Sequence, residues 1–157
     1  LEVKLKKDDT GLEFYVIVIH AKASSDQSSY DKRVDISNNL MNYLSTSRSS
    51  DYVILLGDFN DKMIGSITNG ESSPYQNFVN SSAFNTISSS LNSGSQSEHS
   101  LPGFGNTIDH IILSDEFTSS FIKDGSLNIL EDELRSLYPD YTATVSDHFP
   151  VNLILKL

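Results

Sequence analysis

Cysteine is absent from the 157-residue sequence. Its absence excludes disulfide bonds, cysteine nucleophiles and thiolate metal sites, although it does not fix the cellular compartment. Long apolar runs are missing as well, since no stretch approaches the roughly 18–20 apolar residues that a membrane-spanning helix needs. We therefore expect no membrane span.

Basic residues are scarce, because 11 Lys and Arg stand against 21 Asp and Glu, which gives a net charge of −10. A protein that binds nucleic acid by neutralising many phosphates is usually basic, so this mode of binding is not expected. Excess acid suits a protein that holds hard divalent cations through carboxylates. It equally suits a protein whose charge only keeps it in solution, so that charge alone leaves both interpretations open.

The length is that of one ordinary domain, and residues 1–157 are treated as one unit that is long enough to bury a core. The chain starts with a strand-like pattern at Leu1–Leu5. Because a native chain rarely starts inside a strand, we expect a fragment whose upstream sequence is absent. The lack of a leader segment then says nothing about export.

Apolar and alternating segments predict strands at residues 1–5, 14–20, 52–56, 107–113 and 151–155. The uninterrupted run Tyr15–Ile19 predicts a strand that is buried on both faces. Apolar spacing predicts a helix from residue 29 or 30 to residue 47, with Arg33 outside its buried face. That face is expected to consist of Val34, Ser37, Leu40, Met41 and Leu44.

Strand, helix and strand in this order form a βαβ-like unit, so that a layered α/β sandwich is predicted. Shorter helical segments are expected at residues 74–79 and 131–137, and a short apolar run lies at 127–130. Residues 88–105 are rich in Ser, Asn and Gly, which predicts a long irregular loop.

Side chains with useful chemistry lie at the ends of predicted strands at four places, and they are His20, Asp58, Asn60, Asp109, Asp147 and His148. A buried strand holds its last residue rigidly, and ligand sites of layered α/β proteins gather where the strands end. We therefore expect these side chains to converge on one pocket.

The motif around Asp58 has two interpretations. Asp58 and Asn60 follow Gly57 and are expected to point to one side, with Phe59 turned to the core. Presented together, a carboxylate and an amide would orient a water molecule and bind a phosphoryl oxygen. The same residue types also form Asx turns, which have only a structural role.

The histidines and their acids are also ambiguous. Asp109 is the only acid in an apolar strand and needs a partner such as a histidine, unless it faces water on an edge strand. Asp147 beside His148 allows metal ligation and proton transfer in one place, but also fits a turn with a surface histidine. His20 fits a capped core histidine as well. His110 and His99 are predicted to be structural or exposed.

Four sequence blocks carry a resemblance to a known superfamily. They are His20-Ala21-Lys22-Ala23, Leu56-Gly57-Asp58-Phe59-Asn60-Asp61, Ile108-Asp109-His110-Ile111 and Ser146-Asp147-His148-Phe149-Pro150-Val151. In this order, over nearly the whole chain, they resemble the endonuclease/exonuclease/phosphatase superfamily with its DNase I-like fold, and bacterial extracellular nuclease-like members above all. The resemblance implies two sheets packed face to face with helices outside, of which the chain would hold the C-terminal half to two-thirds.

The resemblance also implies roles. Asp147 would ligate a divalent cation, Mg²⁺ first and Mn²⁺ or Ca²⁺ as alternatives. His148 would act as general base or as a charged stabiliser of the transition state, oriented by Asp109. The implied reaction is metal-assisted hydrolysis of a phosphate ester, and a phosphodiester such as nucleic acid is the first choice.

The other three residues are expected to act on water and phosphate. By the same resemblance, Asp58 would position or deprotonate the attacking water, and Asn60 would hold the phosphate. His20 would contact the scissile phosphate or protonate the leaving group.

The chain departs from the family pattern in one respect, because the upstream Asn and the metal-ligating Glu of the family are not in it. We therefore expect the chain alone to bind metal weakly and to hydrolyse little. Its uncovered sheet face is expected to bind the missing half or a second copy.

Two other functions remain open. A phosphomonoesterase or phospholipase-like member would select its substrate through the loops at 66–73 and 88–105. A catalytically silent binding or scaffolding domain would keep the fold alone. Richness in Ser and Asn, the lack of Cys and the resemblance favour an exported bacterial protein, extracellular or periplasmic.

Overall fold

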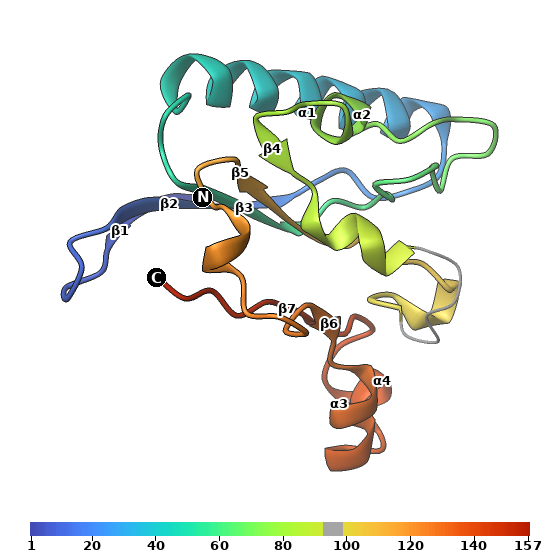
Figure 1. Cartoon of the computed structure of the whole chain (residues 1–157). Coiled ribbons are helices and arrows are strands. Elements are labelled where there is room, and N and C mark those ends of the chain that lie inside the picture. Colours follow the sequence, from blue (N-terminus) through green and yellow to red (C-terminus); the bar gives the residue numbers. More distant parts are fainter. Residues whose placement is uncertain (93–98) are drawn as a thin grey trace.

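The computed structural model describes residues 1–92 and 99–157 and combines a five-stranded and a two-stranded sheet with helices (Figure 1). In chain order its elements are β1 (Glu2–Lys6), β2 (Glu13–His20), α1 (Gln27–Ser47), β3 (Val53–Asp58), α2 (Gln76–Val79), β4 (Phe84–Asn85), η1 (Ile87–Asn92), η2 (Pro102–Phe104), β5 (Asp109–Ser114), η3 (Ser119–Phe121), β6 (Asn128–Ile129), α3 (Glu131–Leu137), α4 (Tyr141–Thr144) and β7 (Val151–Asn152). The strand order of the larger sheet is β1-β2-β3-β5-β4. Only β2 and β3 are parallel among its neighbouring pairs, because α1 returns the chain between them.

The start and the buried face of α1 follow from single side chains. The Asp26 carboxylate accepts a hydrogen bond of 2.9 Å from a backbone N–H of the first turn and caps the helix. Arg33, Ser37 and Leu44 are buried and lie on one face of the helix. The prediction that Arg33 lies outside the buried face is wrong, because its guanidinium pairs with the buried carboxylate of Asp61.

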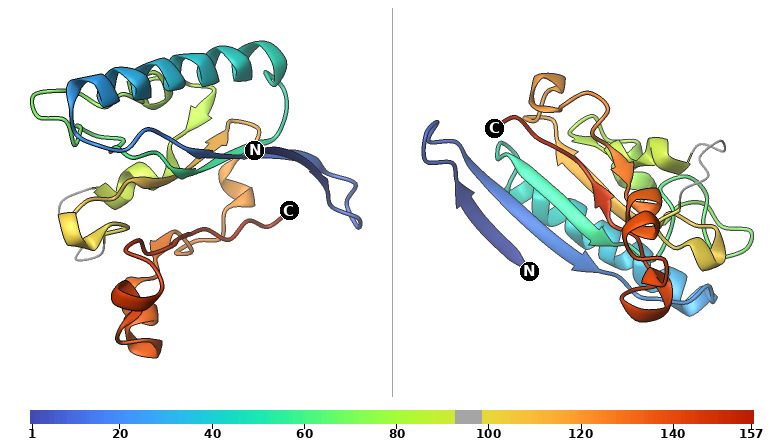
Figure 2. Two further views of the ribbon diagram at one scale, coloured as in Figure 1. Left: turned by 180° about the vertical axis from the view of Figure 1, so that it is seen from behind. Right: turned by 90° about the horizontal axis from the view of Figure 1, so that it is seen from below.

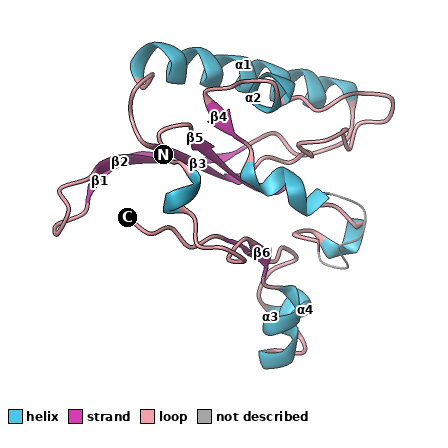
Figure 3. Ribbon diagram, viewed as in Figure 1, coloured by secondary structure: helices cyan, strands magenta, loops and turns pink. Residues whose placement is uncertain are grey.

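Two apolar cores lie on the two faces of the larger sheet. α1 and α2 cover one face, where Ile17, Leu55 and Ile112 pack against Leu44 of α1 (Figure 1). The β6–β7 sheet and α3 lie on the other face, as the further views show (Figures 2 and 3). The buried residues of this second core are Phe14, Ile54, Ile111, Leu113 and Phe117. Alternate residues of each strand thus contribute to different cores.

The second face is only partly covered. Val3 and Leu5 of β1 are 39% and 42% exposed there, and Val18 of β2 is 38% exposed. The prediction of a strand buried on both faces is therefore wrong for Val18, because the two-stranded β6–β7 sheet is too narrow to cover β1 and β2 (Figure 2). Binding of a missing half or of a second copy to this face stays a prediction.

Some predicted boundaries also need correction. The irregular loop predicted at 88–105 includes the 3₁₀ helices η1 and η2, while residues 93–98 lie outside the described part. The last strand is shorter than predicted, since β7 ends at Asn152 and Leu155 forms a single bridge with Ile122. β4 and α4 were not predicted. Within residues 1–92 and 99–157, every helix is too short or too polar to cross a membrane.

Candidate active site

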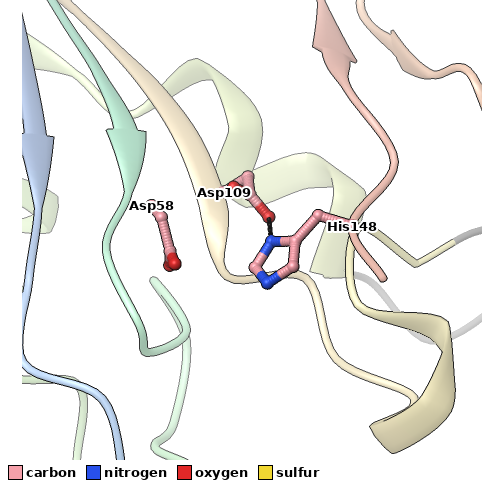
Figure 4. A group of neighbouring side chains, drawn as sticks. All are labelled: Asp58, Asp109 and His148. Atoms are coloured by element: carbon pink, nitrogen blue, oxygen red, sulfur yellow. Dashed lines mark hydrogen bonds and ion pairs between the residues drawn. The ribbon is translucent and has the colours of Figure 1, made fainter. Parts of the chain in front are cut away.

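The polar residues at the strand ends lie in a row across the sheet. In the sheet register His20 stands opposite Asp58, and Asp58 stands opposite Asp109. Directly opposed residues of neighbouring strands point to the same face. His148 reaches the row from the segment before β7, and its ring lies beside Asp109 and faces Asp58 (Figure 4).

Asp58 is held by the turn that follows its strand. Asn60 has a positive φ of 51°, which Asn tolerates better than most residues. Its backbone N–H donates to Asp58 Oδ1 at 2.8 Å, and its side-chain amide donates to Asp58 Oδ2 at 3.0 Å and to the carbonyl of Ala21 at 3.1 Å. The predicted Asx turn is therefore present, and it orients the carboxylate. Phe59 is buried, as predicted.

The hydrogen bonds of the Asn60 side-chain amide bear on its predicted role as a phosphate ligand. An amide NH₂ has two hydrogens to donate, and both are used within the protein. In this conformation Asn60 has no side-chain N–H left for a phosphate oxygen, and its observed hydrogen bonds hold the carboxylate of Asp58. The role of a phosphate ligand stays a prediction.

Asp109 and His148 form a hydrogen-bonded pair. The distance from His148 Nδ1 to Asp109 Oδ2 is 2.7 Å, and because a carboxylate only accepts, Nδ1–H donates. In the neutral ring Nε2 is then unprotonated and able to take a proton. Burial by itself would lower the pKa of His148, but the hydrogen bond and charge of Asp109, with the charges of Asp58 and Asp147, raise it above the usual 6.5.

Asp58, Asp109 and His148 also form a possible metal site, since each offers one ligand atom within 4.8 Å of the others. Burial raises the pKa of Asp109, hydrogen bonds with Ser100 and His148 oppose the shift, and the charge of Asp58 adds to it. Two carboxylates that face each other across a sheet are unfavourable unless a positive charge lies between them. Oxygen and imidazole ligands suit Mg²⁺, Mn²⁺ or Zn²⁺, so that the donor set fits a divalent cation.

Comparison with protein-family models and with curated proteins finds no match. Solved structures do match. An endonuclease/exonuclease/phosphatase family protein from Bacteroides thetaiotaomicron is 22% identical with a TM-score of 0.56, and the match covers 98% of this chain and 54% of that one. TDP2 of D. rerio, complexed with single strand DNA product, is 13% identical with a TM-score of 0.64, over 94% of this chain and 58% of that one. The mannosyl-6-phosphatase Bt3783 of Bacteroides thetaiotaomicron VPI-5482 is 22% identical with a TM-score of 0.56. That match covers 99% of this chain and 56% of the other chain.

The chain has the endonuclease/exonuclease/phosphatase fold. It spans little more than half the length of these neighbours. The DNase I-like architecture expected from the four sequence blocks is therefore confirmed.

In this fold Gly57, the second-last residue of β3, allows β2 and β3 to approach closely. Gly57 has a φ of +133°, and a Cβ atom placed there would lie 2.1 Å from the carbonyl oxygen of Ile19. Any side chain at position 57 would therefore push β3 away from β2, immediately before Asp58. The glycine is needed both for its backbone conformation and for the absence of a side chain.

Gly57→Ala is accordingly expected to lower the free energy of unfolding by roughly 3 kcal/mol or more, from backbone strain and overpacking together. The matched control is Gly65→Ala, because Gly65 has a φ of +72° but no atom lies within 4 Å of the place that the new methyl group would take. The control should cost only about 1 kcal/mol, which is the strain of the left-handed backbone alone. Urea unfolding of both variants measures the two losses in the free energy of unfolding. Equal losses would show that the contact with Ile19 does not contribute.

Ser100 is a buried residue that supports the candidate site and that the sequence did not reveal. It is fully buried, and its hydroxyl oxygen accepts the backbone N–H groups of Ile108 at 2.9 Å and Asp109 at 3.1 Å. Its carbonyl accepts the N–H of Phe149 at 2.7 Å. Ser100 therefore ties the start of β5 to the segment that carries His148. Its position in a Ser-rich stretch gave no signal.

Arg33 and Asp61 form a buried ion pair beneath the site, which the sequence did not reveal either. The guanidinium donates to Asp61 Oδ2 at 3.0 Å, to the carbonyls of Lys22 at 2.8 Å and Ser24 at 2.7 Å, and to Thr68 Oγ1 at 3.0 Å. These partners belong to the loops that follow β2 and β3. Arg33 thus fixes both loops around Asp58.

His110 is a structural histidine, as one of its two predicted interpretations had it. It is buried between Ser88 Oγ, 3.0 Å from Nδ1, and the carbonyl oxygen of Asp61, 3.0 Å from Nε2. Because a carbonyl only accepts, Nε2 carries the proton and Nδ1 accepts from the hydroxyl. The ring is therefore neutral and links β5 to the turn after β3.

The stability of the chain should fall in mild acid because of His110. Burial lowers the pKa of His110 to about 4, whereas a histidine of the unfolded chain titrates near 6.5. Below about pH 6.5 the unfolded state binds a proton that the folded state does not bind. The contribution of His110 to the free energy of unfolding is therefore fully present above about pH 6.5 and is lost as the pH falls toward about 4. The slope is at most about 1.4 kcal/mol per pH unit. Urea unfolding of His110→Gln between pH 7 and pH 4 should show a shallower slope than wild type. His20→Gln serves as an exposed control, and an unchanged slope in His110→Gln would contradict the assignment.

The remaining residues singled out from the sequence are His20, Asp147 and His99, and none of them belongs to the group of three converging ligand atoms. His20 is largely exposed, with Nε2 3.4 Å from Asp58 Oδ2, so that it is not a core histidine. Asp147 is exposed, and it does not belong to the group of three converging ligand atoms. Its predicted role as the metal ligand therefore stays a prediction, while its charge acts on His148. His99 is partly buried, and its backbone N–H donates to Glu131 Oε2 at 3.3 Å.

Proposed function

We propose that the protein hydrolyses a phosphate ester with the help of a divalent cation. The observation that supports this most is the Asp109–His148 pair, which faces the oriented carboxylate of Asp58 in this fold. One group of the site is thus prepared to accept a proton and another to align water. The carboxylates of Asp58 and Asp109 would hold the cation, which would supply positive charge that stabilises the phosphate in the transition state, while His148 Nε2 stays free for proton transfer.

The residues have separate tasks in this proposal. His148 Nε2 takes a proton from the attacking water or stays charged beside the phosphate, while Asp109 keeps the ring in the required tautomer. Asp58 orients the water, and Asn60 keeps Asp58 in place through its two hydrogen bonds. His20 is largely exposed beside Asp58, where it would protonate the leaving group or contact the scissile phosphate.

Two of the neighbours bear on the kind of ester. One was solved with a single strand DNA product and another is named as a mannosyl-6-phosphatase. We propose a phosphodiester as the first choice and a phosphomonoester as the second. Cation-dependent hydrolysis distinguishes both from a silent binding domain.

The test is hydrolysis of bis(p-nitrophenyl) phosphate and p-nitrophenyl phosphate, with Mg²⁺ and with a chelator. Because the chain spans little more than half of each neighbour, the assay uses the chain and any longer product of its gene. We expect Mg²⁺-dependent turnover that the chelator abolishes and that Asp58→Asn removes. Asp8→Asn, in the exposed β1–β2 turn, is the control and should keep full activity.

Turnover that resists the chelator, or that persists in Asp58→Asn, would contradict the proposed site. If neither ester is hydrolysed by either form, the silent binding domain is the better interpretation. Calorimetric titration of Mg²⁺ into the chain gives an independent readout, and the same Asp58→Asn substitution should weaken binding.

A further inference from the structure

A cavity of about 450 Å³ opens beside the row of site residues. Asn60 lines it, and the same residue holds Asp58 through two hydrogen bonds. The other walls come from the loop after β2, the loop after β3 and the segment before β5. A phosphate ester at Asp58 would therefore have one of its substituents at the mouth of this cavity.

None of the nine lining residues carries a charge, although the chain has 32 charged side chains. Hydroxyl and amide groups come from Ser25 and Asn106, Ser24 Oγ can only accept because its hydroxyl donates to Asp26, and apolar surface comes from Ile67 and Leu101 among others. The adjoining cavity of about 270 Å³ differs, since Arg135 and Asp147 line it. These two adjoining cavities of the described part of the chain therefore differ in the charge of their walls.

Phe104 is the aromatic wall of the cavity, with 77% of its surface accessible. The loop that carries it is closed by a pair of backbone hydrogen bonds, Leu101 N–H to the Asn106 carbonyl at 2.8 Å and Asn106 N–H to the Leu101 carbonyl at 3.3 Å. On the opposite side, Ser24 has a φ of 93° and its carbonyl is held by buried Arg33. Both walls are therefore fixed without a ligand, which favours binding.

We infer that this cavity binds the alcohol part of the phosphate ester as a neutral, hydroxylated ring that stacks on Phe104 and hydrogen-bonds to Ser24, Ser25 and Asn106. A polyphosphorylated substituent would need cations that the walls do not offer. A long acyl chain would leave the hydroxyl and amide groups without partners, which costs free energy. A ring with an apolar face and polar edges matches both kinds of wall. The inference rests on the proposed function for its link to the ester, but ring binding itself requires no catalysis.

Saturation-transfer NMR on the chain tests the inference with four neutral or charged probes. Methyl glucoside and adenosine are the two hydroxylated rings, and they distinguish a sugar from a nucleoside as the natural occupant. Inositol hexakisphosphate and a short-chain phosphatidylcholine below its micellar concentration are the comparison ligands. We expect saturation transfer to at least one ring probe, and a signal reduced at least fivefold in Phe104→Ala. Tyr138→Ala removes an exposed aromatic side chain that does not line the cavity and should leave the signal unchanged.

Three results would overturn the inference. They are the absence of transfer to both rings, an equal signal in Phe104→Ala, and competition for the ring probe by inositol hexakisphosphate in the absence of metal. Hydrolysis without ring binding would contradict the inferred ring subsite but not the proposed hydrolysis. Ring binding without hydrolysis by any form of the protein would remove the proposed function and leave the subsite in place.

Discussion

Arg33→Met is expected to lower the free energy of unfolding by about 3–5 kcal/mol, because it leaves the carboxylate of Asp61 buried without its cation. Both side chains are fully buried, and Asp61 also accepts hydrogen bonds from Ser66 Oγ at 2.8 Å and from the N–H of Ile67 at 2.7 Å. These weaker partners do not neutralise the charge. Urea or thermal unfolding followed by circular dichroism gives the loss.

Arg48→Met is the matched control, since Arg48 forms an ion pair with Glu2 in which both side chains are partly exposed. The control should cost at most about 1 kcal/mol. Arg33→Lys should recover little stability, because an ammonium cannot reach the four acceptors that the planar guanidinium contacts. A loss in Arg33→Met that does not exceed the loss in Arg48→Met would contradict this account of the pair.

His148→Ala is expected to lower the rate constant of Mg²⁺-dependent hydrolysis by about 100- to 10,000-fold, the usual contribution of a positioned general base or acid. Asp109→Asn should cause a large loss as well, because an amide that donates to Nδ1 would leave Nε2 protonated. The measurement is initial rate on bis(p-nitrophenyl) phosphate with the form of the protein that hydrolyses it. Neither variant should change the far-ultraviolet circular dichroism.

His99→Ala provides the histidine control for this prediction. His99 is not among the three converging ligand residues, and its printed hydrogen bond is a backbone one to Glu131, so that loss of its side chain should change the rate less than about threefold. An His148→Ala protein with wild-type rate would exclude His148 from the chemistry. The Asp109–His148 hydrogen bond would then have a structural role alone.

Most of the fold and much of the site could be predicted from the sequence, because the signals are local. The runs before His20 and Asp58 end at a polar residue, and each run is a strand in the structure that ends there. Asp109 was predicted to need a histidine partner, and the 2.7 Å bond to His148 supplies it. An apolar strand has a fixed backbone position in the sheet. The sheet register therefore also fixes the position of a polar residue at the end of that strand.

The features that the sequence did not reveal depend on contacts between distant segments. Arg33 looked like a surface residue of α1 because its partner Asp61 lies 28 positions away. Ser100 had no signal because nothing in a polar loop distinguishes a buried serine from an exposed one. Asp147 and His148 are neighbours in sequence, yet only His148 joins the ligand group, since adjacent side chains need not point the same way.

The larger sheet can associate with other copies of the chain through its two edges or through its partly exposed apolar face, and these two surfaces differ. β1 forms one outer edge and carries exposed Lys4 and Lys6, while β4 at the other edge is only two residues long. Short edges and lysine side chains hinder the addition of a further strand, the step by which sheets grow into fibrils. Aggregates of this chain should therefore form through the exposed valine and leucine side chains of β1 and β2, and detergents or cosolvents that coat apolar surface should dissolve them more readily than they would dissolve amyloid.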